Sequence, residues 1–513
     1  MRAMSVDPAS AAAALKEMAD ELGADQVFAG EEDRAAYSDL FAADGDLHRP
    51  SGAVAPETVE EVQAVLRIAN ARRVPLWPVS RGKNFGYGTA APVVRGSIVV
   101  DLSRMKKIEL DAENGTVLVE PGVSFFDLFD YIQERGLPLW LSVPGNSWGS
   151  VAGNALDRGV GYTPYGDHAA QICGIEAVLP DGDIVRTGMG AMPNSANWQL
   201  YRAGYGPSWD AMFCQSNFGI VTRLGLWLMP EPEAVLGINV DADRPEDLEW
   251  LVDTIAPLRR SGLIRQSPSI APWLRAAATM TQRDQWAAPG QPLSQSAIAA
   301  IRREFGIGWW STAIRLYGPL KVTQAARKIV RQAFDNRPVL SISDTQWLRG
   351  DPPEGSPVTG VPITYPLANV NWFGGRGGHL SFSPVLPARG DLALKLFANN
   401  QKLHDRHGFD YHPSFSVGER SMNNINQLLF DLDDPVMAGN LDRLFRDLVR
   451  DAAAEGFAEY RAHIDYMDVV ADTFSFNNHA LRRLNERLKD ALDPNGILAP
   501  GKSGIWPASV GRA

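Results

Sequence analysis

A glycine-rich loop follows an apolar strand early in the chain but does not lead into a helix. The stretch PVSRGKNFGYGTAAP, residues 78–92, places Gly82, Gly86 and Gly88 directly after the apolar run 74–79. Its spacing is not G-x-G-x-x-G, and the Thr-Ala-Ala-Pro that follows cannot open the helix of a Rossmann dinucleotide fold. Such a loop can turn its N–H groups inward around a pyrophosphate, or it can be a tight connection between strands. The loop alone leaves both interpretations open.

A second glycine-rich segment, GILAPGKS at residues 496–503, matches the phosphate-binding pattern G-x-x-x-x-G-K-[ST]. A P-loop needs a buried strand before it and a helix after it, whose N-terminus binds the phosphates. Here the leucine spacing within 481–492 predicts a helix before the loop, and the turn Asp-Pro-Asn-Gly at 493–496 ends that helix. Only ten residues follow Ser503. We therefore predict that the segment is not a P-loop, although its lysine, Lys502, can contact a cofactor.

Length and composition limit the class of protein. A chain of 513 residues is too long for one hydrophobic core, so we expect two domains. A net charge of −11 argues against nucleic acid or an anionic membrane as the main partner. The two cysteines form no CxxC motif or His/Cys cluster, which argues against a disulfide scaffold or a zinc site and is typical of a reducing cytosol. We predict no signal peptide, no membrane span, no metal and a cytoplasmic location.

Local patterns predict alternating helices and strands in the first part of the chain. We expect a helix after Pro56, strands at 74–79, 97–102 and 116–122, and a helix that begins at the Ser124–Asp127 capping box. From about residue 231 the helices are longer, and Trp and Phe are more frequent. We predict a cofactor-binding domain over 1–230 and 460–513, interrupted by a substrate domain over 231–459.

Several longer motifs occur in one order along the chain. They are HRPSGAVAPETVEEVQ (48–63), SRGKNFGYGTAAP (80–92), VEPGVSFFDL (119–128), GNALDRGVGYTPYGDH (153–168), LPDGDIVRTGMGAMP (179–193), YGPSWDAMFCQSNFGIVT (205–222), YRAH (460–463) and DPNGILAPGKSG (493–504). This set resembles the vanillyl-alcohol oxidase and 4-cresol dehydrogenase family of FAD enzymes, which includes the eugenol oxidases.

The resemblance implies an α+β flavoprotein with an FAD-binding domain of two α/β subdomains and a cap domain whose antiparallel sheet is flanked by helices. It implies oxidation of para-substituted phenols, such as 4-alkylphenols, 4-hydroxybenzylic alcohols and eugenol-like or lignin-derived phenols. Hydride would pass from the benzylic carbon to flavin N5, and the substrate would become a p-quinone methide. It further implies oxygen or a cytochrome as electron acceptor and a homodimer.

The resemblance also assigns roles to residues. Tyr87, Tyr460 and Arg461 match the family's phenolate-binding set. The residues that would bind FAD are Ser80, Arg81, Gly82, Lys83, Asn84, Phe85, Gly86, Gly145, Asn146, Gly153, Asn154, Tyr162, Asp167, His168 and Lys502. The residues that would line the substrate pocket are Tyr162, Trp372, Phe382 and Asn424, although the two aromatic rings are equally typical of core packing.

This sequence departs from the family pattern at two places. Gly145 stands where the oxidases usually have an aspartate near flavin N5, and Asn423-Asn424 replaces a His-His pair that includes the covalent flavin ligand of some members. An asparagine amide is not nucleophilic enough for such a bond, so we predict non-covalent FAD, with a tyrosyl link through Tyr411 as the alternative. Two other functions stay open: a catalytically silent flavin-binding protein, and an oxidoreductase for a bulkier lignin-derived dimer.

Overall fold

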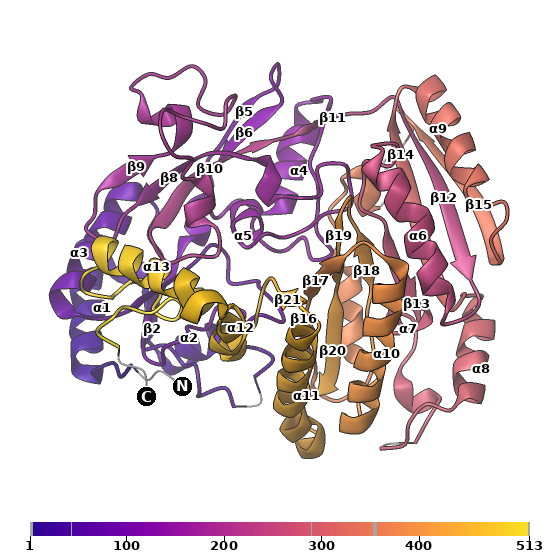
Figure 1. Ribbon diagram of the computed structural model, residues 1–513. Helices are drawn as coiled ribbons and strands as arrows, with labels where there is room; N and C mark the ends of the chain where they lie inside the picture. The colour runs from indigo at the N-terminus through magenta and orange to yellow at the C-terminus, as the bar shows by residue number, and fades with distance from the viewer. Residues whose placement is uncertain (1–3, 43, 289, 352–355, 511–513) are drawn as a thin grey trace.

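The computed structural model describes residues 4–42, 44–288, 290–351 and 356–510. Figure 1 shows the N-terminal elements on the left and the elements from β12 (Ala234–Ala242) onward on the right, with the last two helices back on the left. The chain therefore forms a first part and then a second part, and its C-terminal helices lie beside the first part again (Figure 1).

The first subdomain is a four-stranded sheet with two helices on it. The strand order is β1-β2-β4-β3, and β2 and β3 both run parallel to β4. Apolar side chains of α1 and α3 pack on this sheet in one buried core. The elements are α1 (Pro8–Leu22), β1 (Val27–Phe28), α2 (Glu31–Ala36), β2 (Gly52–Val54), α3 (Val59–Arg72), β3 (Leu76–Val79) and β4 (Ile98–Asp101).

The second subdomain is a five-stranded antiparallel sheet in the order β5-β6-β10-β8-β9. The predicted capping box is present, because the Ser124 hydroxyl accepts from the Asp127 N–H and the Asp127 carboxylate accepts from the Ser124 N–H. The elements are β5 (Ile108–Asp111), β6 (Thr116–Val119), α4 (Phe125–Glu134), β7 (Leu139–Trp140), α5 (Val151–Leu156), β8 (Ile172–Val178), β9 (Ile184–Arg186), β10 (Ile220–Trp227) and β11 (Met229–Pro230).

The second part of the chain is an eight-stranded sheet in the order β15-β12-β14-β13-β18-β19-β17-β21, with a separate pair β16-β20. Every described strand pair in it is antiparallel, and α6, α9, α10 and α11 flank it (Figure 1). This arrangement confirms the predicted fold class. The helices are α6 (Asp247–Arg260), α7 (Trp273–Ala277), α8 (Gln295–Phe305), α9 (Leu320–Gln332), α10 (Gly390–His407) and α11 (Pro435–Ala454). The strands are β12, β13 (Ser269–Pro272), β14 (Trp310–Gly318), β15 (Val339–Leu348), β16 (Gly377–Phe382), β17 (Pro384–Pro387), β18 (Phe415–Val417), β19 (Ser421–Asn424), β20 (Asn426–Asp431) and β21 (Ala458–Glu459).

The C-terminal segment closes the first subdomain. After α12 (Met467–Thr473) and α13 (Phe476–Leu492), the chain runs beside β3, where the Leu76 N–H donates to the Ile497 carbonyl at 2.7 Å. Lys489 and Asp493 form a fully buried ion pair at 2.7 Å that fixes this turn. The segment 496–503 is followed by no α-helix in the described residues, so the P-loop geometry is missing. We retain the domain limits 1–230, 231–459 and 460–513 as a proposal.

Candidate active site

A cavity of about 380 Å³ lies where the glycine-rich loop, the second subdomain, the β16–β20 region and the C-terminal segment meet. Most of the residues predicted to bind FAD line it. They are Ser80, Gly82, Lys83, Asn84, Phe85, Gly145, Asn146, Gly153, Asn154, Tyr162 and Lys502. The structure therefore brings together three motifs that are far apart in the chain.

Arg81 and Gly86 belong to the same loop but do not line the cavity. The Arg81 guanidinium points toward the second subdomain, where its Nη1 donates to the Gly122 carbonyl at 3.0 Å. Gly86 has φ +78°, and a Cβ there would lie 2.6 Å from Nε2 of His379. Glycine is required at this position because the loop both turns into the left-handed region and packs against a ring. These two residues shape the loop.

Asp167 and His168 also lie outside the cavity lining. Asp167 is exposed, and its carboxylate accepts from the Ala170 N–H at 3.0 Å, so it caps a short turn instead of facing the cavity. His168 is buried behind the lining, with Nδ1 at 2.6 Å from Oδ1 of Asn154. Burial lowers the pKa of His168 to about 4, so the ring is neutral and orients Asn154, which does line the cavity.

Three residues expected in the substrate pocket lie in packed cores. Trp372 is fully buried, and its Nε1 donates to Asp410 at 2.8 Å. Phe382 is fully buried with its ring 5.8 Å from that of Phe445. Asn424 is buried and accepts from the hydroxyl of Tyr411 at 3.2 Å.

The residues that face the cavity from these segments are their neighbours, because side chains alternate along a strand. On β16, His379 and Ser381 line the cavity, whereas Leu380 and Phe382 pack into the core. Ile425 and Gln427, one and three positions after Asn424, line it in the same way. The sequence did not show which of two neighbouring residues on a strand faces the cavity. The prediction therefore named Phe382 and Asn424, which lie on the opposite face.

The three predicted phenolate-binding residues all line the cavity. The guanidinium carbon of Arg461 is 4.0 Å from the ring centroid of Tyr87 and 5.9 Å from that of Tyr460. Burial alone would lower the pKa of Arg461, but Tyr87, Tyr460 and Asp157 raise it above its ordinary value. Burial raises the pKa of Tyr460. Arg461 is thus a permanent cation that contacts two tyrosine rings. Its Nε–H is buried without a hydrogen-bond partner in the described residues.

Asp157 connects this cluster to the C-terminal segment. Its carboxylate accepts from Lys502 at 3.1 Å and from the Asn84 amide at 3.3 Å. Sequence reasoning did not single out Asp157, although it lies within the GNALDRGVGY motif. The Gln215 amide also donates to the Tyr460 carbonyl at 2.9 Å. These bonds hold Tyr460 and Arg461 at the end of β21 against the first part of the chain.

The lining fits a bound flavin nucleotide. A Cβ at Gly153 would lie 2.3 Å from Oγ of Ser80, so glycine there lets the loop approach α5 closely. Asn217 lines the cavity, and its Oδ1 atom is buried without a hydrogen-bond partner in the described residues, so it is a candidate acceptor for a ligand donor. Lys83 adds a cation on the loop. A loop with a cation and free backbone N–H groups can bind anionic phosphates.

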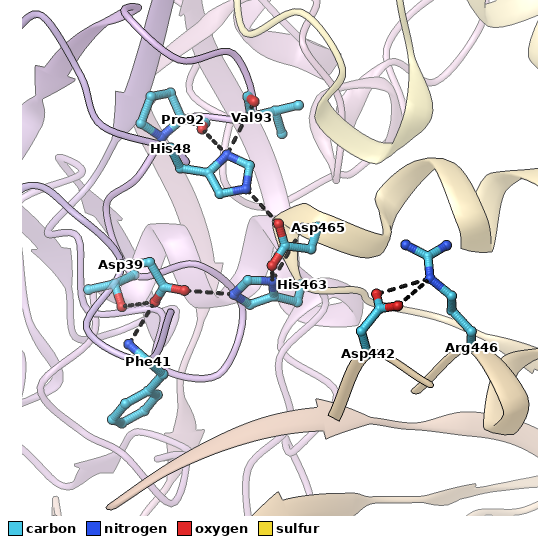
Figure 2. Close-up of polar contacts among 10 residues, drawn as sticks. Asp39, Phe41, His48, Pro92, Val93, Asp442, Arg446, His463 and Asp465 are labelled. Carbon is cyan, nitrogen blue, oxygen red and sulfur yellow. Dashed lines mark hydrogen bonds and ion pairs between the residues drawn. The ribbon is translucent and has the colours of Figure 1, made fainter. Parts of the chain in front are cut away.

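A buried chain of acids and histidines fixes the YRAH segment against the glycine-rich loop (Figure 2). His463 Nε2 lies 2.9 Å from Asp39, which also accepts from the Thr89 hydroxyl at 3.1 Å. Asp465 lies 2.6 Å from Nε2 of His48. Thr89 is two residues after Tyr87, and His463 is two residues after Arg461, so this chain couples the two halves of the tyrosine–arginine cluster.

We predict that His463→Gln destabilises the protein in a pH-dependent way. Burial alone would lower the pKa of His463, but hydrogen bonds to Asp39 and Asp465 raise it to about 9. Because the folded pKa exceeds the unfolded value near 6.5, the stabilisation is fully present below pH 6.5 and is lost as the pH rises through about 9. It amounts to roughly 3 kcal/mol, or about 6–12 °C in Tm for a domain of 150–250 residues.

The measurement is the Tm of both proteins between pH 6 and pH 10 at fixed FAD concentration. The difference should be largest at pH 6, shrink progressively between pH 6.5 and about 9, and be nearly absent at pH 10. His407→Gln is the matched control, because His407 also pairs with an aspartate, at 2.9 Å, but is not a lining residue of the cavity. A difference in Tm that does not change with pH would contradict the assignment.

Four polar lining residues come from the second part of the chain and were not predicted. They are Arg275 on α7, His379 and Ser381 on β16, and Gln427 on β20. Only His379 carried a weak signal, since it directly follows a glycine-rich stretch, GGRGG at residues 374–378. Arg275 lies in a segment without any recognisable motif, so only the three-dimensional fold places it here.

Comparisons with known proteins agree with this site. Residues 50–188 match the model of the FAD binding domain, and residues 392–503 match that of the C-terminal domain of FAD linked oxidases. The chain is 39% identical over 494 residues to the 4-cresol dehydrogenase [hydroxylating] flavoprotein subunit of Pseudomonas putida, which covers 94% of each chain.

Two solved structures have the same fold over nearly the whole chain. The 4-ethylphenol oxidase from Gulosibacter chungangensis, in its isoeugenol complex, has a TM-score of 0.94 and 36% identity and covers 100% of both chains. The p-cresol methylhydroxylase with substrate bound has a TM-score of 0.93 and 36% identity and covers 98% of this chain and 99% of the other. The matched domains, the full-length relative and the cavity together show that this chain is an FAD-dependent oxidoreductase of the vanillyl-alcohol oxidase and 4-cresol dehydrogenase family.

Proposed function

We propose that this enzyme oxidises para-substituted phenols, with 4-alkylphenols and 4-hydroxybenzylic alcohols as the simplest substrates. The observation that carries the proposal is the cluster of Tyr87, Tyr460 and Arg461 in the cavity wall. Two of the enzyme's relatives are a 4-cresol dehydrogenase and a 4-ethylphenol oxidase, which supports the same class of substrate.

The cluster has the right strength to bind a phenol as its anion. Since a free phenol has a pKa near 10, ionising it at pH 7 costs about 4 kcal/mol. Each hydrogen bond to a charged oxygen contributes roughly 1.5–3 kcal/mol. A guanidinium and two phenol hydroxyls that converge on one oxygen therefore offset the cost. The raised pKa of Arg461 keeps its charge throughout the physiological range.

Ionisation at the para oxygen prepares the benzylic carbon for oxidation. The phenolate pushes electron density through the ring, and loss of hydride from the benzylic carbon leaves a neutral p-quinone methide. FAD, when bound, supplies the two-electron acceptor for that hydride. The quinone methide then adds water to give an alcohol, or loses a proton from the side chain to give an alkene.

Because position 145 is a glycine, we expect poor control of water addition to the quinone methide. Gly145 supplies no carboxylate, and the Tyr162 hydroxyl lies 3.0 Å from where its Cβ would be. Asp157, the acidic residue in the described lining, already accepts from Lys502 and Asn84, and Asp167 does not reach the cavity. We therefore expect 4-ethylphenol to give racemic alcohol or 4-vinylphenol. Chiral chromatography that shows one enantiomer in large excess would mean that another group positions the water.

A phenol panel tests the proposed function. The holoenzyme is mixed without oxygen with 4-methylphenol, 4-ethylphenol, 4-hydroxybenzyl alcohol, eugenol and a lignin-derived phenolic dimer, and the flavin absorption band is followed. Bleaching by the simple phenols supports the proposal, whereas bleaching only by the dimer favours an enzyme for bulkier substrates. No bleaching by any compound would indicate a catalytically silent protein.

The electron acceptor and the assembly are part of the same proposal. Admission of oxygen to the reduced enzyme should restore the flavin band within seconds if oxygen is the acceptor. Slow return, with fast return on addition of a cytochrome c, would assign a cytochrome. We also propose a homodimer in the cytoplasm, which sedimentation and cell fractionation test. In the described residues no helix is both long and apolar enough to cross a membrane.

A further inference from the structure

The cavity contains a second arginine that the oxidation of a simple alkylphenol does not use. Arg275 lies on the short helix α7, where Trp273, Leu274 and Ala277 pack into a core, and its own side chain lines the cavity. The Nη1 atom is buried and has no hydrogen-bond partner in the described residues. Burial lowers the pKa of Arg275, and only the phenols of Tyr162 and Tyr365 oppose that effect.

Among the described residues, no carboxylate forms an ion pair with this guanidinium. The described lining contains four cationic side chains, Lys83, Arg275, Arg461 and Lys502, and one acidic side chain, Asp157. Asp157 is bound to Lys502 and so does not serve Arg275. Arg461 lies against the rings of Tyr87 and Tyr460, whereas the tyrosines whose phenols act on Arg275 are Tyr162 and Tyr365. Arginine stays charged when buried, and an unpaired buried charge is costly.

The charge of Arg275 acts on two neutral histidines, His379 and His412. Burial lowers the pKa of His379 to about 4, and burial lowers that of His412 well below its ordinary value, with the charge of Arg275 as the next cause in both. Nδ1 of His379 and both ring nitrogens of His412 are buried without partners in the described residues. A neutral imidazole carries one N–H, so His379, which lines the cavity, can add a hydrogen bond to an anion held by Arg275.

We propose that the preferred substrate carries a carboxylate on its para side chain, and that Arg275 and His379 bind this carboxylate. The inference rests on the proposed oxidation of phenols at the same cavity, with Arg461 at the phenolate. A guanidinium matches the two oxygens of a carboxylate in one plane, and such charge-assisted pairs are the stronger hydrogen bonds in proteins. Polar neutral groups nearby, Ser381 and Gln427, suit an anionic side chain better than an alkyl chain.

The test compares two ligands that differ in the charge of the side chain and by one methyl group. The holoenzyme is mixed without oxygen with 3-(4-hydroxyphenyl)propanoate or with its methyl ester, and the Kd and limiting rate of flavin bleaching are measured for each. The wild-type enzyme should bind the acid at least about 10-fold more tightly than the ester. In Arg275→Met the Kd of the acid should rise about 10- to 100-fold, the range that one or two charge-assisted bonds provide, while that of the ester changes less than about 3-fold. Arg275→Lys keeps the charge and should retain part of the preference.

The outcomes separate this inference from the proposed function. If the ester and 4-ethylphenol bleach the flavin but the acid binds no better than the ester, the carboxylate site is refuted and phenol oxidation stands. If none of the three bleaches the flavin, the proposed function fails. Arg275→Met with lost FAD or an altered flavin spectrum before any phenol is added would show that Arg275 pairs with the cofactor, and would also overturn the inference. The wild-type comparison of acid with ester needs no variant, so it decides the question even if Arg275→Met does not fold.

Discussion

Arg461→Ala should slow the reduction of the flavin by a 4-alkylphenol at least about 10²-fold. The substitution removes the permanent cation that lies 4.0 Å from the Tyr87 ring centroid, while both tyrosines remain. A loss of some 3 kcal/mol of stabilisation for the phenolate corresponds to that factor. The limiting rate without oxygen, measured across a series of phenol concentrations, is the quantity to compare.

A second arginine provides the control for this experiment. Arg446 on α11 bonds to Asp442 at 2.9 Å and lies outside the cavity lining (Figure 2). Arg446→Ala should therefore leave the limiting rate within about 3-fold of wild type, since surface ion pairs contribute little beyond their own site. Equal losses in Arg446→Ala and Arg461→Ala would point to a general change in the fold. An Arg461→Ala enzyme that reduces its flavin at the wild-type rate would contradict the role given to the cluster.

Acid or detergent should release all of the flavin from the purified protein. Asn424 is buried and bonded to Tyr411 in the core, and neither residue lines the cavity. The histidine pair of the covalent family members is absent here, and the Tyr411 hydroxyl, the alternative nucleophile, faces that same core. Filtration of the denatured protein should leave no yellow colour on the chain.

A dissociable flavin also stabilises the fold by mass action. Free FAD at 100 times its Kd adds about 2.7 kcal/mol, which is roughly 5–11 °C in Tm for a domain of 150–250 residues. The melting temperature of the apoprotein should rise with FAD concentration in this range. Fluorescent flavin that migrates with the polypeptide on a denaturing gel would show a covalent bond, and His379, Tyr87, Tyr162 and Tyr460 would then be the nucleophiles in the lining to examine.

The parts of the fold that the sequence predicted depend on local signals. The capping box at Ser124 and the apolar runs of β3, β4 and β6 are set by neighbouring residues, and they agree with the structure to within a few positions. Residues of the glycine-rich loop and of the YRAH segment line one cavity, and their roles there stay predictions from the motifs. Their resemblance to one family also supplied the fold class.

The parts that could not be predicted depend on long-range geometry. Phe382 and Ser381 are adjacent in the sequence, yet one packs in the core and the other lines the cavity, and only the pairing of β16 with β20 decides which. Arg275 comes from a helix with no motif. That its buried Nη1 atom has no hydrogen-bond partner among the described residues is visible only in the assembled fold. The buried contact of His463 with Asp39 joins residues 424 positions apart.

The most direct test of the phenolate site compares 4-ethylphenol with its methyl ether, 4-ethylanisole. The two molecules have the same benzylic carbon, but only the phenol can ionise at the oxygen that Arg461, Tyr87 and Tyr460 are proposed to bind. In anaerobic single-turnover mixing with the holoenzyme, 4-ethylphenol should bleach the flavin band and 4-ethylanisole should leave it unchanged at every concentration. Bleaching by the methyl ether at the rate of the phenol would contradict the phenolate site on which the proposed function rests.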